Sequence, residues 1–321
     1  MRIVFFGIEE LGETCLKALL GAGYDVAGLV TLPAEPLSKP HPLRRIFGAS
    51  SLYPIERIAR SHRIPVMAPP RLKDSQFLRS FQKLKPDLIV VACFDKILPP
   101  ELLEIPRLGG INVHPSLLPR HRGPAPVART LLSGDQQTGI SIHVLDAGVD
   151  TGDLLVQRHL AIKKDETAGS LSHRLAVLAP IALLETLTML WEGRLKPQPQ
   201  RGNGTHAPFL TRQEVHLDWR ASVEDLARMV RACNPYPGAF TIAQDQATAV
   251  LEAMAIHDAS PREVEPGTIL SADPHGVVIQ AGDGTLWCQK FRRAGRIGSP
   301  AHLSELFRSG EVLPSGDWSS L

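Results

Sequence analysis

The 321-residue sequence predicts an α/β fold, an open and mainly parallel sheet, followed by a second, smaller and mostly β domain. Three observations lead to this prediction. Strand and helix patterns alternate through the N-terminal half, and the apolar run Leu88 to Cys93 lacks the polar alternation of a strand with one solvated face. The last third of the chain holds short strand patterns divided by glycine and proline turns.

The alternation begins at the first residues, where Ile3 to Phe6 predicts a strand and Leu11 to Ala22 an amphipathic helix. It ends with the strands Leu88 to Cys93 and Ile111 to Val113. Between them we expect strands at 26–31 and 64–66 and helices at 55–61 and 77–84. This succession is typical of a Rossmann-like sheet, which holds ligands at the carboxyl ends of its strands. We therefore expect functional residues directly after strands.

The chain is long enough for two domains, since one domain usually has ~100–200 residues. Residues 1–193 are expected to form the catalytic domain and residues 207–321 the second domain. The segment 194–206 is rich in proline and glycine, as interdomain linkers often are. In the second domain we expect one helix and several strands, at 223–231, 248–255, 276–280 and 286–291.

Composition favours a cytoplasmic protein, with 43% hydrophobic and 21% charged residues. The longest apolar stretch, Leu175 to Trp191, is interrupted by Glu185, so no membrane span is expected. The four cysteines lie far apart and match no zinc or disulfide pattern. A formal charge of +2 neither requires nor excludes a nucleic-acid partner. We expect the chain to act as a monomer.

A proline-rich loop between Leu32 and Tyr53 is too long for a routine connection and carries Lys39, Arg44 and Arg45. Loops of this kind often contact ligands. A solvated surface insertion explains the same composition equally well. The sequence leaves both interpretations open.

The densest group of chemically active residue types begins on the strand at 111–113. Residues i and i+2 of a strand face the same side, so Asn112 and His114 point together. An amide donor beside an imidazole can stabilise an oxyanion and carry a proton. Downstream, a glycine-rich acidic loop ends at Asp153. The spacing of Gly7 and Gly12 is too sparse for a dinucleotide fingerprint, which excludes a nicotinamide enzyme.

Three motifs in register resemble the folate-dependent formyltransferase family: Asn112-Val-His114, the stretch Ser116 to Gly123, and Asp150-Thr-Gly152. The chain is most similar to the members that formylate methionyl-tRNA. In this family the aspartate lies 36 positions after the histidine, as here (150 − 114 = 36). The resemblance implies that Asn112, His114 and Asp150 transfer a formyl group from 10-formyltetrahydrofolate to a primary amine, without a metal. The implied acceptor is the α-amine of methionyl initiator tRNA.

The resemblance also implies binding residues and an OB-like fold for the second domain. The expected folate-binding residues lie after the fourth strand and around the motifs above: Phe94, Asp95, Lys96, Ile97, Leu98, Ser116, Leu117, Leu118, Pro119, Leu145 and Asp146. The expected acceptor-binding residues are basic: Lys39, Arg44, Arg45, Arg120 and Arg122.

The implied mechanism assigns the oxyanion of the tetrahedral intermediate to Asn112 and a protonated His114. Asp150 would keep His114 charged, because a nearby carboxylate raises the pKa of an imidazole. We assign no function to three other histidines. Of these, His143 is expected to face the folate side of its strand, and His121 and His173 to face solvent.

Two departures from the family pattern affect the acceptor. The tRNA enzymes usually have Gly-Thr-Pro-x-Phe after the first strand, where this chain has Gly7-Ile-Glu-Glu-Leu11, and Asp95 replaces a glycine of their pattern. An alternative acceptor is therefore an amino sugar nucleotide or another small amine. A folate- or tRNA-binding module without catalysis is a third hypothesis, which the presence of all three catalytic residue types opposes.

Overall fold

The structure is a computed structural model that describes residues 1–33, 54–257, 264–293, 296–298 and 307–315. Its contacts divide the chain into two compact units. The first consists of Met1–Pro126, Gln136–Ile162 and Leu171–Pro208, and the second of Val127–Asp135, Lys163–Ser170 and Phe209–Leu321. The predicted pair of a Rossmann-like sheet and a smaller, mostly β part is confirmed. The exact domain limits predicted from the sequence stay a prediction.

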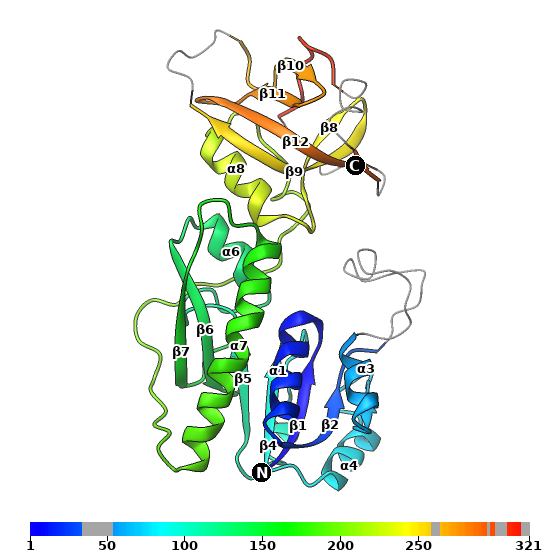
Figure 1. Cartoon of the computed structure of the whole chain (residues 1–321), viewed down its shortest axis with the longest axis vertical. Coiled ribbons are helices and arrows are strands. Elements are labelled where there is room, and N and C mark those ends of the chain that lie inside the picture. Colours follow the sequence, from blue (N-terminus) through cyan, green and yellow to red (C-terminus); the bar gives the residue numbers. More distant parts are fainter. Residues whose placement is uncertain (34–53, 258–263, 294–295, 299–306, 316–321) are drawn as a thin grey trace. The chain divides into compact units, whose positions relative to one another are not determined.

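The first unit contains a seven-stranded sheet in the order β3-β2-β1-β4-β5-β6-β7 (Figure 1). Neighbouring strands from β3 to β5 run parallel, whereas β6 is antiparallel to β5 and to β7. The bounds are β1 Arg2–Gly7, β2 Asp25–Val30, β3 Val66–Met67, β4 Leu88–Ala92, β5 Gly110–His114, β6 Gln137–Val144 and β7 Leu154–Ala161. Mainly parallel pairing places the carboxyl ends of β1, β4 and β5 at one edge.

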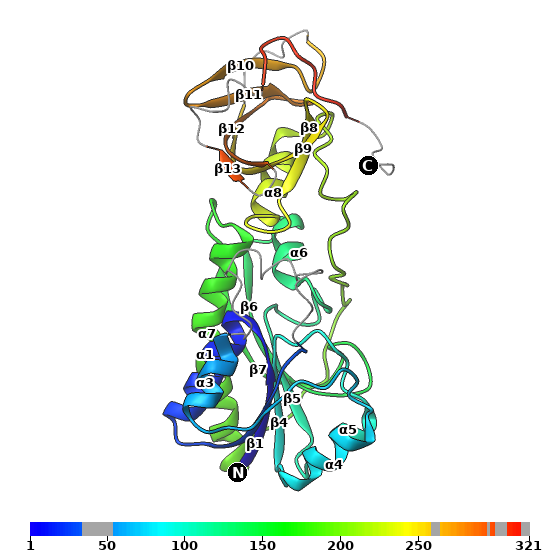
Figure 2. The ribbon, with the colours of Figure 1, turned by 90° about the vertical axis from the view of Figure 1, so that its right-hand side faces the viewer.

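Helices cover both faces of this sheet (Figure 2). One face is covered by α1 (Glu9–Gly21), α3 (Pro54–Ser61) and α7 (Ala168–Trp191), and the other by α4 (Ser75–Lys83) and α5 (Pro100–Leu103). Two covered faces explain why all five residues of β4 are buried.

Phenylalanines fix α4 on its face of the sheet. The helix begins after Asp74, whose Oδ1 accepts hydrogen bonds from the backbone N–H of Gln76 and Phe77 at 2.8 and 3.1 Å. Phe77 and Phe81 are its buried residues, and the ring of Phe81 lies 5.9 Å from that of Phe6 on β1. Burying a side chain of this size stabilises the fold by about 1.5–3 kcal/mol.

Among the described residues, α7 is the one helix long and apolar enough, by length and composition alone, to cross a membrane. Its buried residues recur at spacings of three and four: Leu171, Leu175, Ala179, Ala182, Leu183, Thr186 and Leu187 fall along one side. Such a stripe is typical of a helix that covers a sheet.

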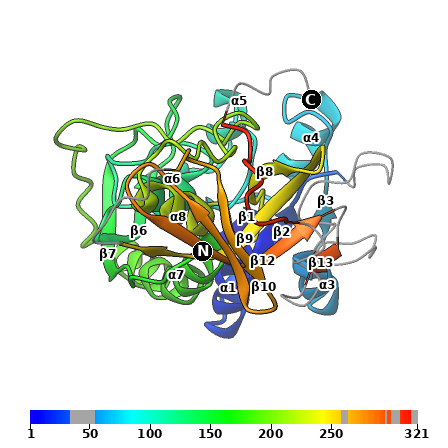
Figure 3. The same ribbon diagram turned by 90° about the horizontal axis from the view of Figure 1, so that it is seen from above.

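The second unit contains an antiparallel sheet in the order β10-β11-β12-β9-β8, with β13 paired to β12 (Figure 3 gives a view from above). The bounds are β8 Ala239–Ala243, β9 Gln246–Ile256, β10 Ile269–Asp273, β11 Gly276–Gln280, β12 Thr285–Arg293 and β13 Arg296–Gly298. Helix α8 (Val223–Ala232) packs on β9 and β12, and α6 (Pro126–Leu132) lies almost wholly within this unit. Trp219 is fully buried in its core, and its Nε1–H donates to Thr241 Oγ1 at 3.2 Å.

Candidate active site

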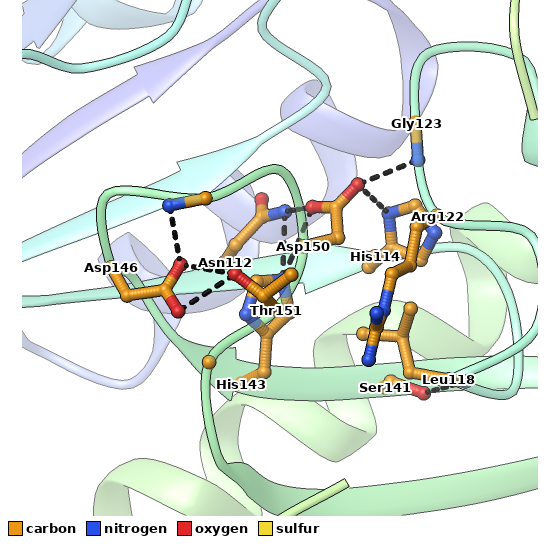
Figure 4. A network of polar contacts seen from close by, with 12 residues as sticks. Asn112, His114, Leu118, Arg122, Gly123, Ser141, His143, Asp146, Asp150 and Thr151 are labelled. Carbon is orange, nitrogen blue, oxygen red and sulfur yellow. Dashed lines mark hydrogen bonds and ion pairs between the residues drawn. The ribbon is translucent and has the colours of Figure 1, made fainter. Parts of the chain in front are cut away.

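A buried polar cluster lies at the end of β5 (Figure 4). Asn112 and His114 come from β5 itself. His143 lies directly opposite Asn112 on the antiparallel strand β6, and the loop after β6 brings Asp150 back to the same place. The structure therefore brings together the three residues expected to be catalytic and adds His143 to them.

Asp150 is the centre of this cluster. Its Oδ1 accepts a hydrogen bond from Asn112 Nδ2 at 3.1 Å and lies 3.3 Å from His143 Nε2. Its Oδ2 accepts from the backbone N–H of Gly123 at 2.8 Å and lies 3.5 Å from His114 Nδ1. The carboxylate is 13% exposed and the His114 side chain 4%. Each carboxylate oxygen thus has two partners, which fix the orientation of the group.

Backbone carbonyls set the protonation of both imidazole rings. His114 Nε2 lies 2.9 Å from the carbonyl oxygen of His121, which can only accept, so this nitrogen carries a hydrogen. In the neutral ring, Nδ1 then carries no hydrogen, and its lone pair faces Asp150. His143 Nδ1 likewise donates to the carbonyl of Val144 at 2.8 Å. Its Nε2, 3.2 Å from Asn112 Nδ2, accepts from the amide when the ring is neutral and donates to Asp150 when it is charged.

The pKa values of Asp150 and His114 are both lowered, for different reasons. Burial alone would raise the pKa of Asp150, but the hydrogen bond with His143, the nearby His114 and the Gly123 N–H together lower this pKa well below its usual range. Burial also lowers the pKa of His114, and this effect exceeds the rise caused by Asp150. In the site without substrate, desolvation therefore opposes the charged His114 that the implied mechanism assigns to the intermediate.

The loop that carries Asp150 is tightly built. Asp150 has a φ of 53°, in the left-handed region that costs a non-glycine residue about 1–3 kcal/mol when it is imposed. Asp146 stabilises the turn by accepting hydrogen bonds from the Gly148 N–H at 3.1 Å and from Thr151 Oγ1 at 2.8 and 2.7 Å. A Cβ atom at Gly152 would lie 1.9 Å from the carbonyl oxygen of Val144, so only glycine fits there.

A second set of hydrogen bonds holds the stretch after β5. Ser141 Oγ donates to the Ser116 carbonyl at 2.6 Å and accepts from the Leu118 N–H at 3.1 Å. Ser116 Oγ donates to the carbonyl of Arg120 at 2.7 Å. Ser116 and Leu118 are buried, and Leu117 and Pro119 are partly buried. These contacts position the chain that supplies Gly123 and the carbonyl of His121 to the cluster.

Residues 94–98, expected to bind folate, follow β4. Phe94 and Leu145 pack against one buried cluster on the α4 side of the sheet, and Leu98 belongs to it. Lys96 Nζ donates to the carbonyls of Pro69 and Pro70 at 3.3 and 3.1 Å, whereas Ile97 is 68% exposed and Asp95 is exposed. The structure therefore brings three of the expected apolar residues together: Phe94, Leu98 and Leu145.

The basic residues expected to bind the acceptor differ in their placement. Arg122 donates to the side-chain oxygen of Gln200, and Arg120 is exposed. Lys39, Arg44 and Arg45 lie outside the described residues. Across the residues that the structure describes, no group of three or more His, Cys, Asp or Glu side chains is arranged to hold a metal ion.

Sequence reasoning missed His143, which was assigned no function although it touches both Asp150 and Asn112. The signal that could have found it is the period of two on β6 together with antiparallel pairing to β5. His121, expected to face solvent, is only 4% exposed, so that expectation is wrong, and its carbonyl accepts from His114 Nε2. His173 is exposed as expected and contacts Glu10.

Comparison with known proteins agrees with this geometry. Residues 1–187 match the family described as formyl transferase, and residues 210–308 match its C-terminal domain. A protein of Marinobacter nauticus named methionyl-tRNA formyltransferase is 38% identical over 315 residues, which are 98% of this chain and 97% of the relative. A protein of the same name from Chromobacterium violaceum is 36% identical over 318 residues, 98% of both chains.

Among solved structures the fold is similar to that of WlaRD, a sugar 3N-formyl transferase crystallised in the presence of dTDP and 5-N-formyl-THF. The TM-score is 0.64 at 13% identity, over 92% of this chain and 98% of that chain. At this identity the likeness concerns the fold alone. The match to residues 1–187, more than half of the sequence, is what decides membership: this chain belongs to the formyl transferase family.

Proposed function

We propose that this protein transfers a formyl group from 10-formyltetrahydrofolate to the α-amine of methionyl initiator tRNA, as a monomer in the cytoplasm. The observation that carries the proposal is the convergence of Asn112 and His114 within 3.5 Å of the Asp150 carboxylate. The relatives named methionyl-tRNA formyltransferase, which align over nearly the whole chain, support this acceptor.

In the proposed reaction the amine attacks the formyl carbon, the C=O electron pair moves to oxygen, and the amine nitrogen must then lose a proton. Neutral His114 is suited to take that proton on Nδ1, because Nε2 already donates to a carbonyl. The imidazolium that forms lies beside the charged Asp150, which stabilises it. His114 then returns the proton to N10 of the folate as the carbon–nitrogen bond breaks, which releases tetrahydrofolate and the formylated amine.

Asn112 would stabilise the oxyanion of the tetrahedral intermediate by a hydrogen bond. In the resting site both hydrogens of its amide point at protein acceptors, Asp150 Oδ1 and His143 Nε2. One of these hydrogens would have to turn to the developing oxyanion, while the hydrogen bond to Asp150 keeps the amide in place.

The folate is expected to lie along residues 94–98 and the stretch after β5. Phe94, Leu98 and Leu145 offer an apolar surface near the carboxyl end of β4, and Asp95, Lys96, Ile97 and Asp146 lie among them. Ser116, Leu117, Leu118 and Pro119 connect this region to the polar cluster. Arg120, Arg122 and the basic residues of the loop at 32–53 are proposed to contact the acceptor.

The second candidate acceptor is an amino sugar nucleotide or another small amine. One observation favours it: the loop Gly7-Ile-Glu-Glu-Leu11 places two carboxylates, Glu9 and Glu10, at the start of α1, and Glu9 takes the position of the proline in the Gly-Thr-Pro-x-Phe pattern of the tRNA enzymes. Carboxylates repel the phosphates of a tRNA. A tRNA acceptor should bind much more weakly as salt rises, whereas a small amine should not.

The test is a comparison of acceptors. The purified protein is incubated with 10-formyltetrahydrofolate and either methionyl initiator tRNA, a methionyl elongator tRNA or a panel of amino sugar nucleotides, and release of tetrahydrofolate is followed. Turnover with the charged initiator tRNA supports the proposal. Turnover with an amino sugar nucleotide and with neither tRNA would make the sugar amine the acceptor. No turnover with any of these acceptors would contradict the proposed function.

A further inference from the structure

The segment 198–207, which leads into the second unit, is hydrogen-bonded along the catalytic loops. Gln198 exchanges two backbone hydrogen bonds with Leu154 at 2.8 and 2.9 Å. Further on, Thr205 Oγ1 accepts from the His121 N–H at 2.8 Å, and the Thr205 carbonyl accepts from the Arg122 N–H at 2.8 Å. The segment therefore touches both the Asp150 loop and the loop that contains Gly123.

One side chain joins these two loops. Gln200 Nε2 donates to the carbonyl of Asp150 at 2.9 Å and to that of Gly152 at 2.8 Å. Its Oε1 accepts from Arg122 Nε at 3.1 Å and Nη2 at 2.7 Å. All four hydrogen-bonding valences of the amide are used, and two of them end on the backbone that presents the Asp150 carboxylate.

The Asp150 backbone needs such support. Its left-handed φ of 53° is a conformation that persists only where its surroundings impose it. Asp146 holds the loop through Gly148 and Thr151, and Gln200 holds it through the carbonyls of Asp150 and Gly152. Arg122 neighbours Gly123, whose N–H binds the carboxylate itself.

We propose that Gln200 is a positioning residue for the formyl transfer reaction: its amide ties the Asp150 loop to Arg122 and so sets the distance between the Asp150 carboxylate and His114. The expected effect on catalysis rests on the proposed function. The expected effect on the position of Asp150 rests on the hydrogen bonds alone. A displacement of the order of 1 Å at a catalytic group can lower the rate about 10²-fold.

Two substitutions together test this role: Gln200→Glu, which adds a charge, and Gln200→Met, which does not. Glutamate keeps the length of the side chain and an oxygen for Arg122, but loses both donors to the carbonyls of Asp150 and Gly152. Gln200→Met keeps the length and removes every polar contact. The matched control is Gln198→Glu, because the side chain of Gln198 is exposed and makes no hydrogen bond in the structure.

Two readouts are measured on the full-length protein. The first is kcat and KM for formyl transfer, where both Gln200 variants are expected to lower kcat on the order of 10–10²-fold with KM changed less than about threefold. The second is the titration of the His114 ring by NMR without substrates, assigned with His114→Gln. Since Asp150 and the hydrogen bond to the His121 carbonyl raise the pKa of His114, whereas burial and His143 lower it, a displaced carboxylate should move this midpoint to lower pH in Gln200→Met, which adds no charge.

The proposal is supported if both Gln200 variants are folded by circular dichroism and lose kcat, and Gln200→Met moves the His114 midpoint down, while Gln198→Glu matches the wild type. An unchanged midpoint in folded Gln200→Met overturns it, and so does loss of folding in both Gln200 variants, which would mean a general structural role. Absence of turnover in the wild type would contradict the proposed formyl transfer but not the positioning role, because the NMR titration tests that role without substrates.

Discussion

Replacing Asp150 with asparagine removes one negative charge and little else. The isosteric amide keeps one oxygen for Asn112 or Gly123, so the loop should stay in place. What is lost is the attraction between the carboxylate and a charged His114 at 3.5 Å, which is worth about 5 kcal/mol at an effective dielectric constant of about 20. Expressed as a rate, this predicts a fall in kcat of roughly 10³–10⁴-fold.

The assay is formyl transfer under saturating folate and acceptor, with the unfolding free energy measured in parallel. KM should change little, because the charge acts on the imidazolium that forms during the reaction and not on bound substrate. Asp146→Asn, four residues earlier in the same loop, is the control for general disturbance of the loop. A folded Asp150→Asn variant with kcat within tenfold of the wild type would refute the assignment.

Three further outcomes are expected. Asn112→Ala should lower kcat by roughly 10²–10³-fold through loss of an oxyanion donor, and a variant of unchanged rate in the same transfer assay would exclude that role. Gly152→Ala should destabilise the first unit by about 1–3 kcal/mol or more in chemical denaturation, because its Cβ meets the Val144 carbonyl, and equal stability would contradict the loop geometry. The hydrogen bond from Arg129 and a backbone N–H lower the pKa of Glu214 from 4.5 to about 2, so Glu214 stabilises the fold above its ordinary pKa and stops doing so as pH falls towards 2. Glu214→Gln should therefore flatten the dependence of Tm on pH across that window, and parallel curves would show that the pair contributes nothing.

Local sequence patterns predicted the elements that are clearly apolar on one face or on both faces. The fully buried strand β4 and the helix α8 lie within a residue or two of their expected bounds. The strand β7 was missed, because it lies at the edge of the sheet and only Val156 among its eight residues is buried. Without an apolar alternation the sequence offers no signal for such a strand.

The candidate site divides in the same way. Asn112 and His114 lie two residues apart on one strand, so their common direction follows from strand geometry alone. The contribution of His143 depends on antiparallel register between β5 and β6. Gln200 reaches the Asp150 loop from 50 residues away, through a segment whose composition predicted only a linker. Long-range pairing of this kind leaves no trace in local composition.

The direction of the His114 pKa shift also lay beyond the sequence. The neighbouring carboxylate of Asp150 was expected to raise the pKa of this imidazole, but burial of the ring lowers the pKa by more. Two contributions of opposite sign can be ranked only when both the distance and the burial are known.

The central claim is that the Asn112, His114 and Asp150 cluster transfers a formyl group to a charged initiator tRNA. A single-turnover experiment tests it most directly. Excess protein is mixed with 10-formyltetrahydrofolate and methionyl initiator tRNA, and the reaction is quenched in acid. The esterified amino acid is then released and identified by mass spectrometry. We predict complete conversion to formylmethionine by the wild type and almost none by a folded His114→Ala variant. No formylmethionine with the wild type, or equal conversion by the variant, would contradict the claim.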